Sequence, residues 1–278
     1  MSHPDRVYWD DAGVTKRDLA DYYVKVWDWI APHLVGRPVA LVRCPEGAAG
    51  QCFFQKHASA GISAKHLHEV REKGDKIISV DDLEGLISLV QAGVLEIHTR
   101  GSTIDHLGKG DRLVFDLDPG PGLGWKDIVA AARDVRERLA QIKLKTFLKT
   151  SGGKGLHVVL PIAPTPWEEA KAFTQTVARA MEADDPDRYV STATKAKRDG
   201  RIFLDYLRNS REATAVAPFS TRARPGAPIS VPIDWDELGS LKSASQYTVG
   251  NVMQRLSRLK KDPWAGIGRV RQTLPKLK

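Results

Sequence analysis

The stretch RLVFDLDPG (Arg112–Gly120) decides the fold, because two carboxylates end an otherwise apolar run. Successive side chains of a strand point to opposite faces, so Asp116 and Asp118 share one face, and Leu113 and Phe115 lie on the other. Two ionised carboxylates side by side repel each other, and one holds a proton unless a cation lies between them. The stretch therefore predicts a core strand that ends either in a divalent-cation site or in two solvated acids.

The segments that follow predict a β-α-β-β-α-β unit. The expected strands are residues 112–117, 144–149, 157–161 and 201–207. The expected helices are residues 128–139 and 170–181. Thr165 and Glu168 predict a capping box at the start of the second helix. This order is the split βαβ, or ferredoxin-like, unit, and its first strand is central in the sheet. We therefore expect His157 and Asp205, on the two neighbouring strands, beside the acids.

The residues before this unit predict a smaller α/β lobe. Thr15 and Asp18 fit a capping box for a helix that ends at Pro32. Two extended segments, RPVALVRCP and QCFFQKHA, are followed by a helix over residues 82–92 and a strand over Val94–His98.

A loop over residues 99–111 is expected to separate this lobe from the rest. The chain is long enough for one large domain or two small lobes. We predict a single α+β domain over residues 1–278, with an N-terminal lobe of about 1–105 and a catalytic lobe of about 106–278.

The charge balance favours a polyanionic partner. The chain has 42 Lys and Arg against 34 Asp and Glu, a net charge of +8, and basic side chains release counterions from phosphates. No run approaches the roughly 18 apolar residues that a membrane span needs, so we expect no membrane partner and a cytoplasmic location. Cys44 and Cys52 form neither a CxxC pair nor a disulfide framework, and we expect both as buried thiols.

A third acid strengthens the metal hypothesis. The stretch RIFLDYLRN places Asp205 among apolar residues of another strand. Three carboxylates from neighbouring strands can hold two Mg²⁺ or Mn²⁺ ions, which prefer hard oxygen ligands. The alternative is that Asp205 forms a salt bridge with Arg201 or Arg208.

The stretch TSGGKGLH (Thr150–His157) predicts a phosphate-binding loop. Its glycines let backbone N–H groups turn toward an anion, and Ser151, Lys154 and His157 add side-chain donors. It is not a Walker loop, since the GxxxxGK[ST] spacing is absent. The alternative is a tight glycine hairpin.

The stretch APFSTRARPG offers a second anion site. Arg222 and Arg224 occupy alternate positions, so in an extended chain they project together and fit a triphosphate. The alternative is a solvated basic loop. Arg198, in KAKRDGR, is a further candidate contact within a charged run that is more often solvated surface.

The ordered set DRLVFDLDPG, TSGGKGLHVVLP, FLDYLRN and APFSTRAR resembles the polymerase domain of bacterial DNA ligase D, a member of the archaeo-eukaryotic primase superfamily. The early segments DRVYWDDAGVTKRDLADYY, CFFQKHA and VLEIH fit as well. The resemblance runs from about Asp5 to Trp264 and implies a primase-like fold.

The resemblance also implies an activity. Such domains are template-directed nucleotidyltransferases that add ribonucleotides or deoxynucleotides to a primer 3′-hydroxyl, with Mn²⁺ or Mg²⁺, during gap filling and non-homologous end joining. The implied partners are DNA ends, gapped DNA with a 5′-phosphate, nucleoside triphosphates, the end-joining protein Ku, and a fused or separate DNA ligase. A nucleoid-associated location follows from these partners.

The resemblance assigns roles by position. Asp116, Asp118 and Asp205 match the metal-binding and catalytic acids, and Asp205 would help the primer hydroxyl to attack. The matched nucleotide-binding positions are His98, Ser151, Lys154, His157, Arg198, Arg222, Arg224, Phe53 and Phe54, of which the last two are the stacking aromatic pair. Arg6 and Lys16 match the pocket for a DNA 5′-phosphate, and Lys16 lies in the first turn of a predicted helix, where phosphate is favoured. His3 departs from the Asn common in the family.

Two alternatives stay open at this stage. A DxD phosphatase of the haloacid-dehalogenase kind would need a Thr or Val soon after the second Asp and a Rossmann-like strand order. A non-catalytic DNA-end-binding module would not need all three acids. The sequence does not distinguish a stand-alone polymerase from a domain of a larger ligase.

Overall fold

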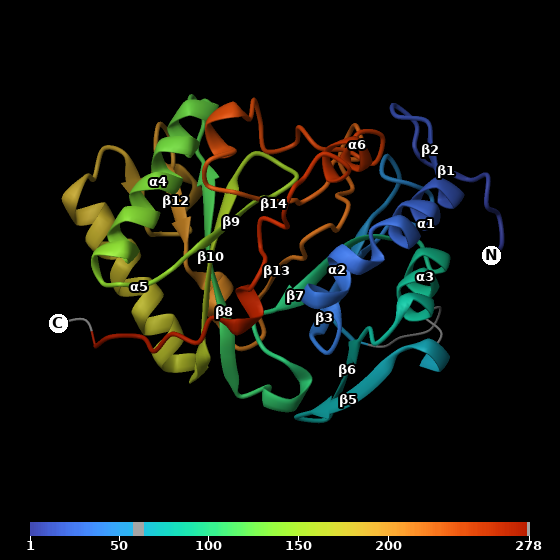
Figure 1. Ribbon diagram of the computed structural model, residues 1–278, viewed down its shortest axis with the longest axis horizontal. Coiled ribbons are helices and arrows are strands. Elements are labelled where there is room, and N and C mark those ends of the chain that lie inside the picture. Colours follow the sequence, from blue (N-terminus) through green and yellow to red (C-terminus); the bar gives the residue numbers. More distant parts are fainter. Residues whose placement is uncertain (58–63, 277–278) are drawn as a thin grey trace. The chain divides into compact units, whose positions relative to one another are not determined.

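The computed structural model describes residues 1–57 and 64–276 and divides into two compact units (Figure 1). Unit 1 comprises Met1–Asp105, Thr214–Val231 and Tyr247–Leu259, and unit 2 comprises His106–Ala213, Pro232–Gln246 and Lys260–Lys278. The first boundary falls beside the predicted one. The later segments differ from the predicted contiguous lobes, because strand β13 (Thr214–Val216) pairs with a strand of unit 1. Arg222 and Arg224 therefore belong to unit 1.

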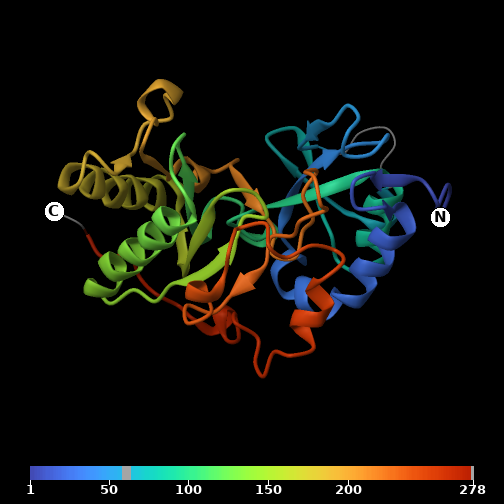
Figure 2. The same cartoon turned by 90° about the horizontal axis from the view of Figure 1, so that it is seen from above.

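Unit 2 is built on a six-stranded sheet with the strand order β11-β12-β8-β10-β9-β14. Its strands are β8 (Lys109–Pro119), β9 (Phe147–Thr150), β10 (Leu156–Pro166), β11 (Tyr189–Val190), β12 (Ile202–Asp205) and β14 (Pro232–Ile233). The helices α4 (Trp125–Gln141) and α5 (Trp167–Asp184) lie on the same side of this sheet (Figure 2). The chain order β8-α4-β9-β10-α5-β12 confirms the predicted β-α-β-β-α-β unit, with β8 central between β12 and β10.

Apolar periodicity explains this packing. The predicted faces of α4 and α5 are buried, including Ile128, Val135 and Val177. Leu113 and Phe115 on β8 are also fully buried. Burial of such side chains is worth about 1.5–3 kcal/mol each, so the helices and the sheet form one core that holds β8 in place.

Unit 1 contains a second sheet with the order β13-β7-β3-β6-β5, and β4 also pairs with β3. The strands of this sheet besides β13 are β3 (Pro38–Arg43), β4 (Phe53–Gln55), β5 (His68–Glu72), β6 (Asp75–Ser79) and β7 (Val94–Arg100). A separate two-stranded sheet is formed by β1 (Val7–Trp9) and β2 (Val14–Thr15). Its helices are α1 (Lys16–Lys25), α2 (Trp27–Leu34), α3 (Leu83–Gln91) and α6 (Val252–Leu256). Short 3₁₀ helices in the two units span Ala64–His66, Ile104–His106, Lys195–Lys197, Leu207–Asn209, Leu238–Ser240 and Ile267–Arg269.

Local capping was predicted correctly at one helix and wrongly at another. The Thr15 hydroxyl accepts from the Asp18 amide, and the Asp18 carboxylate accepts from the Thr15 amide, so the capping box of α1 is confirmed. The box at Thr165 is wrong, because β10 continues to Pro166 and the Thr165 hydroxyl donates to Ala163 O. The first predicted helix is in fact two helices, α1 and α2, and the β5–β6 hairpin was not predicted.

The expectation of two free thiols is wrong, because Cys44 and Cys52 form a disulfide. Cys44 follows β3 and Cys52 precedes β4, and these strands are antiparallel with Arg43 opposite Phe53. The next pair along this register is Cys44 and Cys52, so the hairpin brings the two sulfur atoms together. The sequence spacing alone did not show this register.

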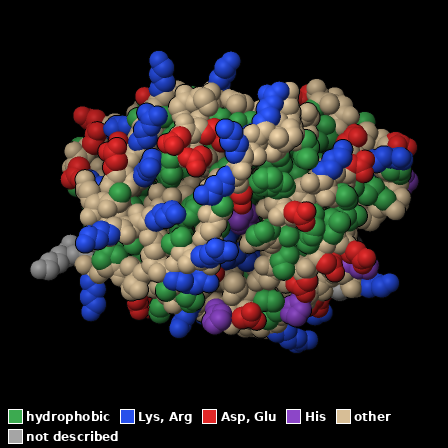
Figure 3. All heavy atoms as spheres, viewed as in Figure 1, with side chains coloured by type: hydrophobic (Ala, Val, Ile, Leu, Met, Phe, Trp, Pro, Cys, Tyr) green, Lys and Arg blue, Asp and Glu red, His purple; other side chains and the backbone are tan. Residues whose placement is uncertain are grey.

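The basic excess of the sequence does not form a single block on the face drawn in Figure 3. Lys and Arg side chains are interspersed there with Asp and Glu. No helix among the described residues is both long and apolar enough to cross a bilayer.

The disulfide should stabilise the oxidised protein. Closing so short a loop is worth about 2–3 kcal/mol in the chain-entropy model, so dithiothreitol should lower the free energy of urea unfolding of the wild type by about that amount. Cys52→Ser should show the lower value with or without reductant. Peptide mapping without reductant should recover a linked 44–52 pair, and two freely alkylated cysteines in the oxidised protein would refute the bond.

Candidate active site

The three predicted acids meet on two adjacent strands of unit 2. In the antiparallel ladder of β8 and β12, Asp205 lies directly opposite Asp116, and Phe203 lies opposite Asp118. Asp116, Asp118 and Asp205 each offer one carboxylate oxygen, and these oxygens all lie within 4.8 Å of one another. Asp116 and Asp205 are buried and Asp118 is half-buried. The structure therefore brings together the trio that the sequence predicted.

The pKa values of the three carboxyl groups shift in different directions. Burial and the charge of Asp116 raise the pKa of Asp118 to about 6, and burial raises the pKa of Asp205 despite the charge of Arg208. Burial also acts to raise the pKa of Asp116, but His157 and Arg208 outweigh it, so this pKa falls well below its usual range. The cluster thus holds more negative potential than its protein neighbours neutralise. Its oxygen donors fit Mg²⁺ or Mn²⁺.

Arg208 joins two of the acids. Its Nε lies 3.3 Å from an oxygen of Asp116 and 3.1 Å from an oxygen of Asp205. The sequence suggested Arg208 only as an alternative partner for Asp205. The structure shows that this ion pair exists beside the acid cluster rather than instead of it.

His157 flanks the acids on the other neighbouring strand. It lies opposite Asp116 in the ladder of β8 and β10, and its Nε2 is 3.2 Å from Asp116 Oδ1. Burial lowers the pKa of His157 to about 4 in spite of the charge of Asp116, so the ring is neutral at pH 7 and Nε2–H donates to the carboxylate. Within the part of the chain that is described, the buried Nδ1 of His157 has no hydrogen-bond partner.

The glycine loop between β9 and β10 is packed against the acid strand. A Cβ at Gly155 would lie 2.1 Å from Leu117 O, so only glycine fits there. The Gly153 and Gly155 amides donate to Ser151 Oγ, each at 3.2 Å. These amides therefore hold the loop together rather than facing outward as predicted, whereas Lys154 is exposed.

Arg198 lies near the same strand ends. Its guanidinium stacks over the Phe203 ring at 3.8 Å, and Nη2 donates to Ala193 O. Its charge lowers the pKa of both Asp118 and Asp205 as a minor contribution. Arg198 is thus part of the acid cluster's surroundings.

Asn209 fastens the end of β12 to β8. Its Nδ2 donates to Val114 O at 2.8 Å and to Tyr206 O at 3.0 Å, and its Oδ1 accepts from Val114 N at 2.8 Å. The side chain therefore replaces a backbone partner just beyond Asp205, where β12 turns away. Sequence reasoning missed Asn209, because a polar residue after a strand does not reveal its partner.

Unit 1 carries a separate cluster of predicted residues. His98 Nε2 lies 2.8 Å from Glu96 Oε2, and Arg222 Nε lies 3.0 Å from the same oxygen. The Phe54 ring meets the His98 ring edge to face at 5.8 Å. The structure thus brings His98, Phe54 and Arg222 together around an acid that the sequence analysis did not select.

One expectation about unit 1 needs correction, and the exposure of a second predicted pair is informative. Phe53 and Phe54 are both exposed, at 44% and 50%. Both lie on the short strand β4, and Arg43 packs over the Phe53 ring at 5.3 Å. The chain at Arg222 and Arg224 is not extended, because the Arg224 amide donates to Arg222 O in a tight turn.

Lys16 and Arg6 lie close together at the start of α1. The Lys16 ammonium donates to Ser2 O at 3.1 Å and to Gln91 O at 3.0 Å. Burial and the charge of Arg6 lower the pKa of Lys16, while Arg6 donates to Pro45 O. An ammonium has three N–H donors, so the two carbonyl contacts orient Lys16 without exhausting its donors.

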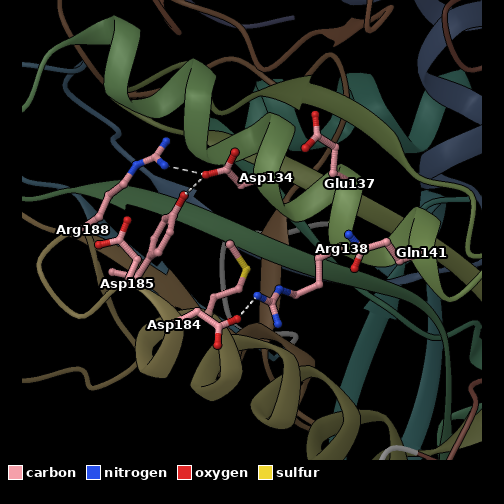
Figure 4. A pocket seen from close by; sticks show the side chains of 9 residues that line it. Asp134, Glu137, Arg138, Gln141, Asp184, Asp185 and Arg188 are labelled. Carbon is pink, nitrogen blue, oxygen red and sulfur yellow. Dashed lines mark hydrogen bonds and ion pairs between the residues drawn. The ribbon is translucent and has the colours of Figure 1, made fainter.

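Unit 2 also contains a cavity of about 260 Å³ that is distinct from the acid cluster (Figure 4). Residues of α4 and α5 line it together with Arg188 and Tyr189. Two of its acids are paired within it, since Arg188 lies 2.7 Å from Asp134 and Arg138 pairs with Asp184. None of the sequence-predicted site residues lines this cavity.

The comparisons with known proteins agree with this geometry. The chain is 38% identical to the multifunctional non-homologous end joining protein LigD of Pseudomonas aeruginosa, over 99% of the chain and 33% of that protein. The corresponding protein of Mycolicibacterium smegmatis is 34% identical over 86% of the chain and 32% of its own length. The chain therefore spans about a third of the length of these relatives.

A solved structure matches the whole fold. The polymerase domain from Mycobacterium tuberculosis ligase D, in complex with DNA, superimposes with a TM-score of 0.87 at 31% identity, covering 97% of each chain. The fold is therefore primase-like, and it is the fold of a polymerase domain. The chain belongs to the family of LigD primase-polymerase domains, whose model matches residues 15–264.

The strand pairing of unit 2 excludes the phosphatase alternative. That alternative needs a Rossmann-like parallel order, whereas β8 pairs antiparallel with both β10 and β12. The complete acid trio also argues against a non-catalytic module.

Asn209→Ala should weaken the acid site without touching an acid. Loss of the amide leaves the buried N–H and C=O of Val114 unpaired, which costs about 1–3 kcal/mol for each group, and frees β12 to shift relative to β8. We expect a lower melting temperature and weaker Mn²⁺ binding, measured by calorimetry on the folded fraction. Asn251→Ala, at the start of α6 in unit 1, is the matched control. Mn²⁺ binding as tight as in the wild type would contradict this role.

Proposed function

We propose that this domain is a metal-dependent, template-directed polymerase that fills gaps and extends DNA ends in non-homologous end joining. One observation carries the proposal: the carboxylates of Asp116, Asp118 and Asp205 gather within 4.8 Å on adjacent strands, in a chain of the primase-polymerase family. These three residues would hold two Mn²⁺ or Mg²⁺ ions. When bound, such ions supply Lewis acidity and offset the charge of the reacting phosphate.

In the proposed reaction, the primer 3′-hydroxyl attacks the α-phosphorus of a nucleoside triphosphate. A new P–O bond forms, the bond to pyrophosphate breaks, and the hydroxyl proton leaves the attacking oxygen. We assign the role of receiving that proton to Asp205, which lies opposite Asp116 in the ladder of β8 and β12. Neutral His157 donates to Asp116 and keeps that carboxylate ionised.

The remaining predicted residues are assigned to the nucleotide. Lys154, Arg222 and Arg224 would stabilise the charge that develops on the leaving pyrophosphate. The further proposed contacts to the nucleotide are His98, Ser151, His157, Arg198, Phe53 and Phe54. The exposure of both phenylalanines supports stacking on a base.

The proposed partners are DNA ends and gapped DNA with a 5′-phosphate. The proximity of Arg6 and Lys16 at the first turn of α1 supports a phosphate pocket there. We extend the proposal to Ku and to a ligase domain or separate DNA ligase, since the relatives are named as end-joining proteins. A protein that acts on DNA ends and gaps would lie in the cytoplasm and associate with the nucleoid, and we propose this location.

Removal of one acid should abolish catalysis. Asp116→Ala or Asp205→Ala should lower primer extension with Mn²⁺ by on the order of a thousandfold or more, because the carboxylates no longer suffice to hold the cations. DNA binding, measured by fluorescence anisotropy, should change little. Glu137→Ala, in the cavity of Figure 4, is the matched control and should extend like the wild type. Extension retained by either acid variant would refute the assignment.

Lys16→Ala should weaken DNA binding to an extent that depends on the 5′-phosphate. Loss of a charge-assisted contact worth about 1.5–3 kcal/mol should weaken binding to a gap with a 5′-phosphate by about tenfold or more. Binding to the same gap without the phosphate should change far less. Lys25→Ala, at the exposed end of the same helix, should bind both gaps normally. An equal loss on both gaps would argue against the pocket.

A further inference from the structure

Glu96 is a buried acid of β7 to which the proposed function assigns no role. Its side chain contacts three groups of unit 1 at once. Oε2 lies 2.8 Å from His98 Nε2 and 3.0 Å from Arg222 Nε, and Oε1 accepts from the Ala223 amide at 2.9 Å. Glu96 is only 6% exposed, so one carboxylate joins a strand to a loop that lies far away in sequence.

The loop is fixed along β7 by other contacts as well. The Ile97 amide donates to Ser220 Oγ at 2.8 Å, and Thr221 Oγ1 donates to Leu95 O at 2.6 Å. These bonds continue the pairing of β13 with β7. They hold the backbone before Arg222, and Glu96 contacts the Arg222 side chain itself.

The carboxylate of Glu96 is ionised. Burial alone would raise its pKa, but the hydrogen bond with His98, the charge of Arg222 and the Ala223 amide lower it to about 2. A buried charge is tolerated only when its partners stay in place. Any movement of Arg222 or His98 away from Glu96 therefore carries an energetic cost.

We propose that Glu96 is a positioning residue that holds Arg222, His98 and the Ala223 loop ready for the triphosphate of the incoming nucleotide. The inference rests on the proposed function, since it assumes that Arg222 and His98 meet the nucleotide. It adds that triphosphate affinity depends on an acid that touches no phosphate. The carboxylate fixes the guanidinium at Nε, so the direction of its planar fork is set before the substrate arrives.

The test compares nucleotides that differ only in their phosphates. Glu96→Gln keeps the shape of the side chain but removes its charge. Calorimetry with Mn²⁺ should show UTP binding weakened by about tenfold, the loss of one charge-assisted contact, and UMP binding nearly unchanged. In primer extension kcat/KM for UTP should fall by a similar factor, because Arg222 is assigned both to the bound triphosphate and to the leaving pyrophosphate. Glu96→Asp, which keeps the charge, should bind UTP more tightly than Glu96→Gln.

Two controls separate positioning from general damage. Glu72→Gln removes the charge of the other buried acid of the unit 1 sheet, which pairs with Arg100 at 2.6 Å; it should lower stability without a change in UTP binding. In an Arg222→Ala background, Glu96→Gln should cost much less than in the wild type, because coupled residues are not additive.

Three results would overturn the inference: UTP binding unchanged in Glu96→Gln, an equal loss for UTP and UMP, or a full loss in the Arg222→Ala background. None of them touches the proposed function, which fails only if the wild type does not extend a primer or if the acid variants do. Should Glu96→Gln not fold, Glu96→Asp takes its place in the comparison with the wild type. Its shorter side chain withdraws the carboxylate from Arg222, so UTP binding should weaken and UMP binding should not. An unchanged affinity for UTP, or an equal loss for UTP and UMP, would overturn the inference.

Discussion

Repulsion among three carboxylates is the constraint on which unit 2 depends. The register of β8 with β12 places Asp205 opposite Asp116, and the alternation of β8 adds Asp118 on the same face. Left alone, such a cluster would push its strands apart or take up protons. Arg208, neutral His157 and the Asn209 clamp hold it together. The repulsion that remains raises the pKa of Asp118, and a bound cation would relieve it.

Unit 1 also uses a charged contact to hold its groups in place. There a single buried acid, Glu96, contacts both Arg222 and His98. In both units a charge is fixed by a partner one strand or one loop away, so that little rearrangement is left for the moment of binding. Preorganisation of this kind is a large source of catalytic power in polar sites.

The sequence was sufficient for the β-α-β-β-α-β part of unit 2 and for the acid trio. Alternation in RLVFDLDPG and the order of strands and helices predicted the central strand and both neighbours, and the structure confirms them. What it could not supply were partners across the chain. Glu96, Asn209 and the Cys44–Cys52 bond all depend on register, which shifts every contact when it slips by one residue. Arg222 was predicted in an extended chain, because a local turn leaves little trace in composition.

The discontinuous build of unit 1 has a consequence for biosynthesis. Its sheet takes β13 from Thr214–Val216, and its last segment is Tyr247–Leu259. The amino-terminal portion therefore cannot reach its final form when it first leaves the ribosome, but must wait until the segment up to Leu259 has been made. Until then the edge of β7 that β13 later covers stays open to wrong pairing.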